Sequence, residues 1–294
     1  MKLFFVFNIH AGKGQVKTNL PAIIDVISAA GHELTVYSTQ SAGDAYEKVL
    51  ALPEGVYDRV ICAGGDGTLD EVVAAMNKRQ EKLTIGYIPA GSTNDFAVSL
   101  GLPKKMRDAA KVAIGDRLFN CDVGRFNDKA FVYVAAFGLF TEVSYQTPQD
   151  IKNVLGHSAY ILEGMKRLQD VRSYKMTVVA NGESVEREFI YGMVTNSQSV
   201  GGFKNITGRD VDLADGLFEV TLVCKPNNPI ELNETINAFI SRNMDCKGIV
   251  SFKASKVEFI SDEAIPWTLD GEYGGEGTRM EVENMNKNMW IAVE

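Results

Sequence analysis

Hydrophobic and polar residues follow two alternating patterns over residues 2–114. Short apolar runs rich in β-branched and aromatic residues predict strands at Lys2–Asn8, Glu33–Ser38, Asp58–Ala63 and Thr84–Ile88. Apolar residues recurring at helical spacing predict helices at Val16–Ala30, Gly43–Leu52, Leu69–Lys78, Thr93–Leu100 and Met106–Ile114. Strands that alternate with helices over short loops favour a mostly parallel sheet with helices on both faces.

The pattern changes after about Arg117, where strands follow one another with few helices between them. Strands are predicted at Leu118–Phe126, Ala130–Phe137, Tyr174–Ala180, Ser184–Thr195, Leu217–Cys224, Ile249–Lys253 and Val257–Ile260. Helices are predicted at Ala159–Val171 and Pro229–Arg242, and Asn181-Gly182 predicts a two-residue hairpin. We therefore expect an α/β domain at residues 1–121 and an antiparallel β-sandwich domain at residues 122–294. Whether the final residues return to the first domain stays open.

Three glycine-containing turns follow strands of the predicted parallel sheet. The first holds Asn8, Ile9, His10, Ala11 and Gly12; the second holds Gly64, Gly65, Asp66, Gly67, Thr68, Leu69, Asp70 and Glu71; the third holds Gly91, Ser92, Thr93, Asn94 and Asp95. Glycines remove side-chain bulk where backbone N–H groups approach phosphate oxygens, and Asp66 and Asp95 add carboxylates beside them. Thr68, Ser92 and Thr93 are expected to cap the helices that follow.

A single turn of this kind is also explained by a strand-to-helix connection that needs glycine for its backbone conformation. Three of them at the carboxyl ends of successive strands favour ligand binding, because open α/β sheets bind ligands at that edge. The sequence therefore predicts an anion site for phosphate, built from backbone N–H groups rather than from lysines.

A group of carboxylates precedes a strand in the second half of the chain. Asp210, Asp212 and Asp215 lie close together and end at Gly216. Their oxygen atoms suit a hard cation such as Mg²⁺ or Ca²⁺. An Asp-rich turn that bonds its own backbone explains the same residues equally well, so the pattern alone leaves both interpretations open.

Two further carboxylates are candidates for proton transfer. Glu272 follows Asp270 and Gly271 in a turn after a strand, and Asp122 lies at the predicted domain boundary. If the two domains face each other across a cleft, Glu272 and Asp122 both reach the phosphate turns. A carboxylate there accepts a hydroxyl proton during phosphoryl transfer.

Charge and cysteine content narrow the class of protein. A formal net charge of −8 opposes binding to nucleic acid, whose phosphates repel an acidic surface. The four cysteines form no Cys-x-x-Cys pair, which favours free thiols over disulfides or zinc. No apolar run is long enough for a signal-peptide core or a membrane span, so we expect a cytoplasmic protein with peripheral membrane contact. Candidates for that contact are Lys104, Lys105 and Arg107, and the helix Ala159–Val171.

Taken in order, these motifs resemble those of the diacylglycerol kinase/sphingosine kinase family. The resemblance rests on Asn8 with Gly12, on Gly64–Thr68, on Pro89–Phe96, on Asp215-Gly216 and on Asp270–Glu272. It spans essentially the whole chain and is strongest for the bacterial soluble diacylglycerol kinase and YegS-like branch. The resemblance implies an α/β nucleotide-binding domain, a β-rich lipid-side domain and an active site between them.

The resemblance also implies roles for individual residues. ATP would contact the three glycine turns and Thr39, while Asp66 and Asp95 would orient the nucleotide and Mg²⁺. Asp212, Asp215 and the carbonyl of Leu217 would bind a structural Mg²⁺. Glu272 would be the general base, with Asp122 and Asp66 as the other candidates. The first turn departs from the family's Asn-Pro-x-Ser-Gly pattern, which removes a rigid φ and one hydroxyl.

The leading interpretation is an Mg²⁺- and ATP-dependent lipid kinase that phosphorylates a hydroxyl of diacylglycerol or a related lipid. One alternative is a small-molecule kinase similar to NAD kinase, since NAD kinases share the glycine-aspartate turn of the second motif. Another is a non-catalytic protein that senses lipid or nucleotide. The expected partners are a lipid substrate with a free hydroxyl and a membrane surface bound reversibly, without nucleic acid; a homodimer is left open.

Overall fold

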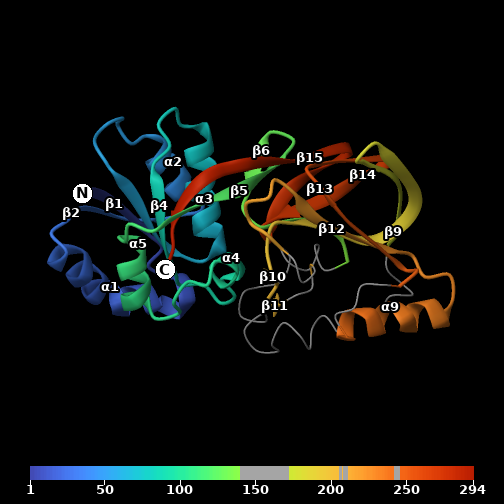
Figure 1. Cartoon of the computed structure of the whole chain (residues 1–294), viewed down its shortest axis with the longest axis horizontal. Helices are drawn as coiled ribbons and strands as arrows, with labels where there is room; N and C mark the ends of the chain where they lie inside the picture. The colour runs from blue at the N-terminus through green and yellow to red at the C-terminus, as the bar shows by residue number, and fades with distance from the viewer. Residues whose placement is uncertain (140–171, 205–206, 208–210, 242–245) are drawn as a thin grey trace. The chain divides into compact units, whose positions relative to one another are not determined.

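The computed structural model describes residues 1–139, 172–204, 207, 211–241 and 246–294 (Figure 1). The chain forms two compact units, a first unit of Met1–Val123 with Asn286–Glu294 and a second unit of Gly124–Met285. The predicted helix Ala159–Val171 and the side chain of Asp210 lie outside the described residues.

A parallel sheet forms the centre of the first unit. Its strands are β1 (Lys2–Phe7), β2 (Glu33–Ser38), β3 (Arg59–Gly64) and β4 (Thr84–Pro89), in the order β2-β1-β3-β4. All residues of β3 are buried, as expected of a parallel strand covered on both faces. The end of β15 (Glu272–Ala292) adds a further parallel strand beside β4, where Ile291 pairs with Ile85.

Helices cover both faces of this sheet. They are α1 (Ala11–Ala29), α2 (Asp44–Leu50), α3 (Asp66–Lys78), α4 (Asp95–Ser99) and α5 (Met106–Ala113). Figure 1 shows α1 and α5 on one side of the strands and α2 and α3 on the other. On the first side, Leu3 and Phe5 of β1 pack with Ile23 and Ile27 of α1. Alternate residues of β1 therefore serve opposite helix layers.

Two helices begin earlier in the chain than predicted. Helix α3 begins at Asp66 rather than Leu69, so part of the second glycine turn is already helical. Helix α1 begins at Ala11 rather than Val16, although Gly12 and Gly14 have positive φ angles of 59° and 80°. Glycines in a first turn conceal a helix from sequence analysis, because glycine is unfavourable in helix interiors.

Two buried arginines satisfy carbonyl groups where helices end. Nη1 of Arg59 donates to the carbonyls of Ala113 and Gly115, both at 2.8 Å, just at the end of α5. Nη1 of Arg79 donates to the carbonyls of Val49, Leu50 and Leu52, at the end of α2. The last carbonyls of a helix have no partner within the helix, so each guanidinium supplies donors that buried backbone requires.

The described part of the second unit is rich in antiparallel strands. They are β6 (Lys129–Phe131), β7 (Val134–Gly138), β8 (Tyr174–Ala180), β9 (Glu183–Thr195), β10 (Ser199–Val200), β11 (Phe203–Lys204), β12 (Phe218–Cys224), β13 (Ile249–Ala254) and β14 (Lys256–Leu269), with the helix α9 (Pro229–Ser241). The order in the main sheet is β13-β12-β9-β7-β14-β15. The strand β5 (Leu118–Phe126) leads into this unit and pairs with β6 and β15.

The predicted hairpin at Asn181-Gly182 is confirmed. Ala180 pairs with Glu183, and Asn181 and Gly182 both have positive φ, as a two-residue hairpin turn requires. Trp267 is fully buried in the core of this unit, where its ring lies against those of Phe137 and Phe259. Trp267 lies in the part of β14 beyond the predicted strand Val257–Ile260.

Two strand predictions were wrong in extent, and one strand was missed. The predicted strand Val257–Ile260 is only part of β14, which runs to Leu269. The predicted strand Ala130–Phe137 is broken at Val132 and Tyr133, so it forms β6 and β7 instead of one strand. The long strand β15 was not predicted, because Glu, Asn and Gly are frequent in it and have low strand propensity. It forms because β14 pairs with it over most of its length. Within the described residues, no helix is long and apolar enough to cross a bilayer.

We expect Arg59→Met to lower the free energy of unfolding by about 2–4 kcal/mol, because two buried carbonyls lose their donor. Urea denaturation measures this change. Arg107→Met is the control, since Arg107 and its partner Asp25 are exposed and their charged groups lie 3.9 Å apart. It should change the free energy by no more than about 0.5 kcal/mol. Equal effects of the two substitutions would contradict the role assigned to Arg59.

Candidate active site

The three glycine turns meet at the carboxyl end of the parallel sheet. A Cβ atom added to Gly12 would lie 2.1 Å from the carbonyl oxygen of Ala90, so the first turn packs directly on the third. A Cβ added to Gly91 would lie 2.8 Å from Cα of Gly65, so the second and third turns are equally close. Glycine is required at Gly12 and Gly91 because any side chain would separate the turns.

Backbone hydrogen bonds hold the second and third turns together. The carbonyl of Gly64 accepts the N–H of Ala90 at 2.7 Å and the hydroxyl of Tyr87 at 3.2 Å. Oδ2 of Asp66, the first residue of α3, accepts the N–H of Asp95 at 3.2 Å. Burial raises the pKa of Tyr87 well above its usual range, and the charges of Asp66 and Asp95 raise it further. The neutral phenol of Tyr87 therefore lies near the carboxylates of Asp66 and Asp95.

The predicted helix caps were wrong. Helix α3 has Gly65 as its N-cap, without a side-chain hydrogen bond, and Thr68 is already inside the helix. Helix α4 has Asn94 as its N-cap, so Ser92 and Thr93 precede it and do not cap it. The amide of Asn94 instead closes the third turn, since its Oδ1 accepts the N–H of Gly91 at 2.7 Å and its Nδ2 donates to the carbonyl of Gly91 at 2.8 Å.

Asn8 and Thr39 shape the edge of the sheet beside these turns. Oδ1 of Asn8 accepts the N–H of His10 at 2.9 Å, which bends the chain between β1 and α1. The N–H of Thr39 donates to the carbonyl of Phe7 at 2.9 Å and fixes the chain after β2. Both residues therefore follow the carboxyl ends of their strands, and their contact with ATP stays a prediction.

Glu71 has a structural task that the sequence did not reveal. Its two carboxylate oxygens accept the N–H groups of Gly43 at 2.8 Å and Ala45 at 3.0 Å, at the N-terminus of α2. A carboxylate in this position satisfies orphan donors and interacts favourably with the helix dipole. Glu71 thus joins α3 to α2 next to the glycine turns.

The candidate bases differ in exposure. Asp122 belongs to the first unit and is completely buried, where its Oδ1 accepts the N–H of Lys287 at 2.7 Å. Glu272 belongs to the second unit and is exposed at the first position of β15. Asp270, which the sequence analysis treated only as part of a motif, lies two residues before Glu272 and is buried. Because a general base must reach the substrate, exposure favours Glu272.

The acidic turn before β12 has the hydrogen bonds of an Asp-rich turn. Oδ1 of Asp212 accepts the N–H of Ala214, and Oδ1 of Asp215 accepts the N–H of Leu217. Oδ2 of Asp215 lies 3.2 Å from Nζ of Lys253, which also pairs with Glu219 at 3.0 Å. Burial raises the pKa of Glu219 to about 7, against the opposing effect of Lys253.

The metal assignment to Asp212, Asp215 and Leu217 stays a prediction. No group of three or more His, Cys, Asp and Glu side chains in the described part of the chain is arranged to hold a metal ion. The ammonium group of Lys253 already supplies one positive charge to this turn. The side chain of Lys253 is therefore a positively charged group beside the predicted metal ligands.

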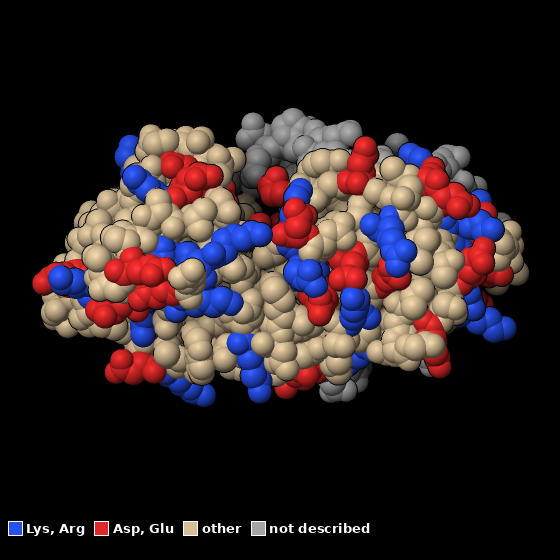
Figure 2. Space-filling model, turned by 90° about the horizontal axis from the view of Figure 1, so that it is seen from above, with Lys and Arg blue, Asp and Glu red and all other residues tan. Residues whose placement is uncertain are grey.

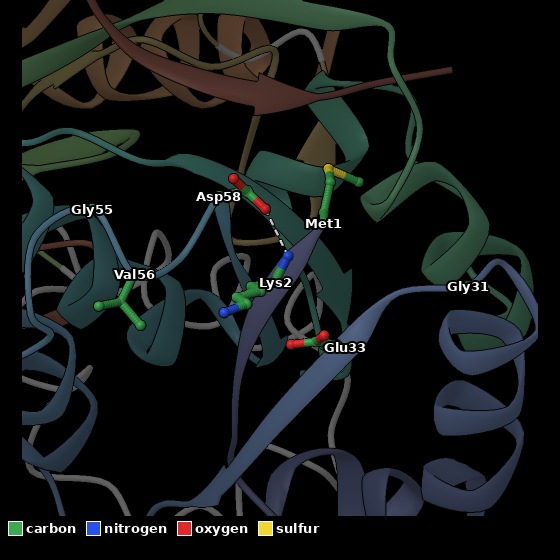
Figure 3. Close-up of a pocket in the computed structure, with 7 residues that line it drawn as sticks. All are labelled: Met1, Lys2, Gly31, Glu33, Gly55, Val56 and Asp58. Atoms are coloured by element: carbon green, nitrogen blue, oxygen red, sulfur yellow. Dashed lines mark hydrogen bonds between the residues drawn. The ribbon is translucent and has the colours of Figure 1, made fainter.

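A pocket of about 510 Å³ lies at the other end of the parallel sheet (Figure 3). Met1, Lys2, Gly31, Glu33, Gly55, Val56 and Asp58 line it. These residues lie at the amino ends of β1 and β2 and before β3, whereas the glycine turns follow the carboxyl ends. The pocket is therefore separate from the predicted phosphate site.

Comparison with known proteins identifies two family models that match most of the chain. A family model described as the diacylglycerol kinase catalytic domain matches residues 2–126. A second, described as the YegS C-terminal NAD kinase beta sandwich-like domain, matches residues 134–285. The chain is 34% identical to a diacylglycerol kinase of Bacillus subtilis over 92% of its own length and 89% of that protein.

The chain belongs to the diacylglycerol kinase family. It is therefore an enzyme of the lipid kinase class. A diacylglycerol kinase of Staphylococcus carnosus is 35% identical over 92% of this chain and 88% of that protein. A crystal structure of a diacylglycerol kinase from Bacillus anthracis str. Sterne shares the fold, with a TM-score of 0.78 at 22% identity, over 100% of this chain and 97% of that chain.

The acidic turn gives a prediction about Mg²⁺. If this turn binds Mg²⁺, the ion should raise the melting temperature of the wild-type protein relative to EDTA but leave that of Asp215→Ala unchanged. Asp215→Ala should also melt several degrees below wild type in EDTA, because the N–H of Leu217 and the ammonium of Lys253 both lose a partner. Differential scanning calorimetry measures both effects.

Lys253→Met is the matched control for this experiment. It removes the ion pair but keeps both aspartates, so it should retain the Mg²⁺-dependent shift. If wild-type protein shows no shift with Mg²⁺, the metal prediction fails and the Asp-rich turn with Lys253 is sufficient.

Proposed function

We propose that this member of the diacylglycerol kinase family transfers the γ-phosphate of ATP to a hydroxyl of diacylglycerol or a related lipid. The observation that carries the proposal is the contact between the three glycine turns at one end of the sheet, in a chain of this family. Such an edge binds phosphates through backbone N–H groups and helix N-termini.

The donor side of the reaction belongs to the first unit. Without Cβ atoms at Gly65 and Gly67, phosphate oxygens can approach the backbone N–H groups at the start of α3. Asp66 and Asp95 provide carboxylate oxygens, the ligand type that Mg²⁺ prefers, and the backbone N–H of Asp95 donates to Oδ2 of Asp66. When bound, Mg²⁺ neutralises charge on the phosphates.

The acceptor side belongs to the second unit. Glu272 accepts the proton of the lipid hydroxyl while that oxygen bonds to the γ-phosphorus and the bond from the γ-phosphorus to the bridging oxygen of ADP breaks. Asp122 is less suited to this step because it is fully buried. The proposal requires that the first unit, which holds ATP, and the second unit, which holds Glu272, act on one substrate pair.

Membrane contact in this proposal is peripheral and reversible. Lys104, Lys105 and Arg107 are exposed at the start of α5 and offer a small basic surface to lipid headgroups. On the face shown in Figure 2, basic side chains lie among acidic ones. Because the net charge is −8, attraction to anionic lipid would depend on local groups of this kind.

We expect Glu272→Gln to lower kcat by roughly 100-fold or more, because glutamine keeps the shape of the side chain but cannot accept the proton. ATP affinity should stay within about threefold of wild type. A radiolabelled-ATP assay with diacylglycerol in mixed micelles measures turnover, and NAD offered as the acceptor tests the alternative reaction. Near-normal kcat for lipid in Glu272→Gln would exclude Glu272 as the base.

The donor site is tested with a pair of glycine substitutions. Gly12→Ala should weaken ATP binding by about tenfold or more, because the new Cβ would force the first turn away from Ala90. Gly14→Ala is the control, since Gly14 also has a positive φ of 80° but has nothing within 4 Å of an added Cβ. Titration calorimetry with ATP should show a change of no more than about threefold for Gly14→Ala. Equal losses would mean that backbone strain, rather than contact between turns, governs binding.

A further inference from the structure

Asp270 makes more contacts with backbone N–H groups than a turn residue usually does. Its Oδ2 accepts the N–H of Val132 at 2.6 Å, and its Oδ1 accepts those of Tyr133 and Val134, both at 2.9 Å. Its own N–H donates to the carbonyl of Val134 at 2.8 Å. All these groups belong to the second unit, and Asp270 is only 6% exposed.

This carboxylate connects two distant parts of the chain. Val132 and Tyr133 form the break between β6 and β7, while Asp270 lies between β14 and β15. The break therefore presents consecutive N–H groups that neither strand uses, and the carboxylate satisfies them. Charge-assisted hydrogen bonds to a buried carboxylate are among the stronger ones in proteins.

The same contacts determine where Glu272 lies. Asp270 and Gly271 have φ angles of 50° and 89°, and Leu269 pairs with Glu272 across the turn. A left-handed conformation is unfavourable for a residue with a Cβ, so Asp270 keeps it only while its contacts hold it there. Since only Gly271 separates Asp270 from Glu272, movement of Asp270 moves the backbone of Glu272.

The three residues that Asp270 contacts, Val132–Val134, form an anchor in the core of the second unit. Val132, Tyr133 and Val134 are all buried, and the carbonyl of Tyr133 accepts the N–H of Asn196 at the end of β9. Strand β7 is paired with β9 on one side and β14 on the other. The backbone of Glu272 is therefore tied to the core of the second unit within two residues.

We propose that Asp270 is the positioning residue for Glu272. Its carboxylate holds the turn so that Glu272 reaches the acceptor hydroxyl, and it does not itself touch the reacting atoms. This inference rests on the proposed function of Glu272 as the base. A displacement of about 1 Å at such a group is enough to cost a large part of the rate.

The test compares Asp270→Asn with Glu272→Gln and Thr268→Val at a temperature well below the melting point of each variant. Asparagine preserves size, but its Nδ2 is a donor and would face an N–H of the anchor. We expect kcat to fall by roughly 10- to 100-fold, with the KM for ATP within about twofold of wild type. Hydrogen exchange should show faster exchange at the amides of residues 132–134.

Thr268→Val controls for general destabilisation of the hairpin. Thr268 lies on β14, is buried, and donates its hydroxyl to the carbonyl of Ala136 at 3.3 Å, so its loss weakens the same hairpin without touching the turn. It should lower the melting temperature and leave kcat near wild type. An equal loss of kcat in Thr268→Val would overturn the inference.

The remaining outcomes separate this inference from the proposed function. If Glu272→Gln is inactive and Asp270→Asn turns over normally, only the role of Asp270 is wrong. If Glu272→Gln is active, the base is wrong and Asp270 cannot position it. If Asp270→Asn does not fold, Asp270→Glu takes its place, because glutamate keeps the charge while its extra methylene displaces the turn. Asp270→Glu should show the same loss of kcat with an unchanged KM for ATP. A normal kcat for Asp270→Glu would overturn the inference.

Discussion

Direct contact between backbones at three turns is the constraint on which the candidate donor site depends. Gly12, Gly65 and Gly91 lie so close to neighbouring main chain that an added Cβ would meet backbone atoms at 2.1–3.3 Å. Because side chains are absent there, the backbones of the turns after β1, β3 and β4 pack directly on one another. The carboxylate of Asp66 accepts the backbone N–H of Asp95, which ties the second turn to the third.

Several buried or partly buried charged side chains serve backbone groups rather than one another. Arg59 supplies donors where α5 ends, Glu71 supplies acceptors where α2 begins, and Asp270 supplies acceptors where β6 and β7 separate. Each charged side chain thus bonds backbone groups at the end of a helix or strand, where the regular hydrogen bonds of that element stop. The backbone of Glu272 is tied to the core of its unit in this way, because only Gly271 separates it from Asp270.

Sequence analysis located features that depend on neighbouring residues and missed those that depend on distant ones. The hairpin at Asn181 and the strands with strong apolar alternation were predictable, because turn chemistry and periodicity are local. The strand β15 was not, since its polar residues are held by pairing with β14. The roles of Glu71 and Asp270 were hidden for the same reason: their partners are 26–28 and 136–138 residues away. The cap assigned to Thr68 failed because α3 begins within the glycine turn itself.

The first turn shows how a departure from the family pattern is accommodated. Proline after Asn8 would fix φ by its ring, whereas here the side chain of Asn8 bonds the N–H of His10 and its carbonyl accepts the N–H of Ala11 at 3.1 Å. These two hydrogen bonds direct the chain into α1 and bring Gly12 against Ala90. The serine of the pattern is replaced by Ala11, which has no hydroxyl and no equivalent donor. Asn8 therefore directs the turn, and if the turn binds ATP as proposed, it offers one hydrogen bond fewer.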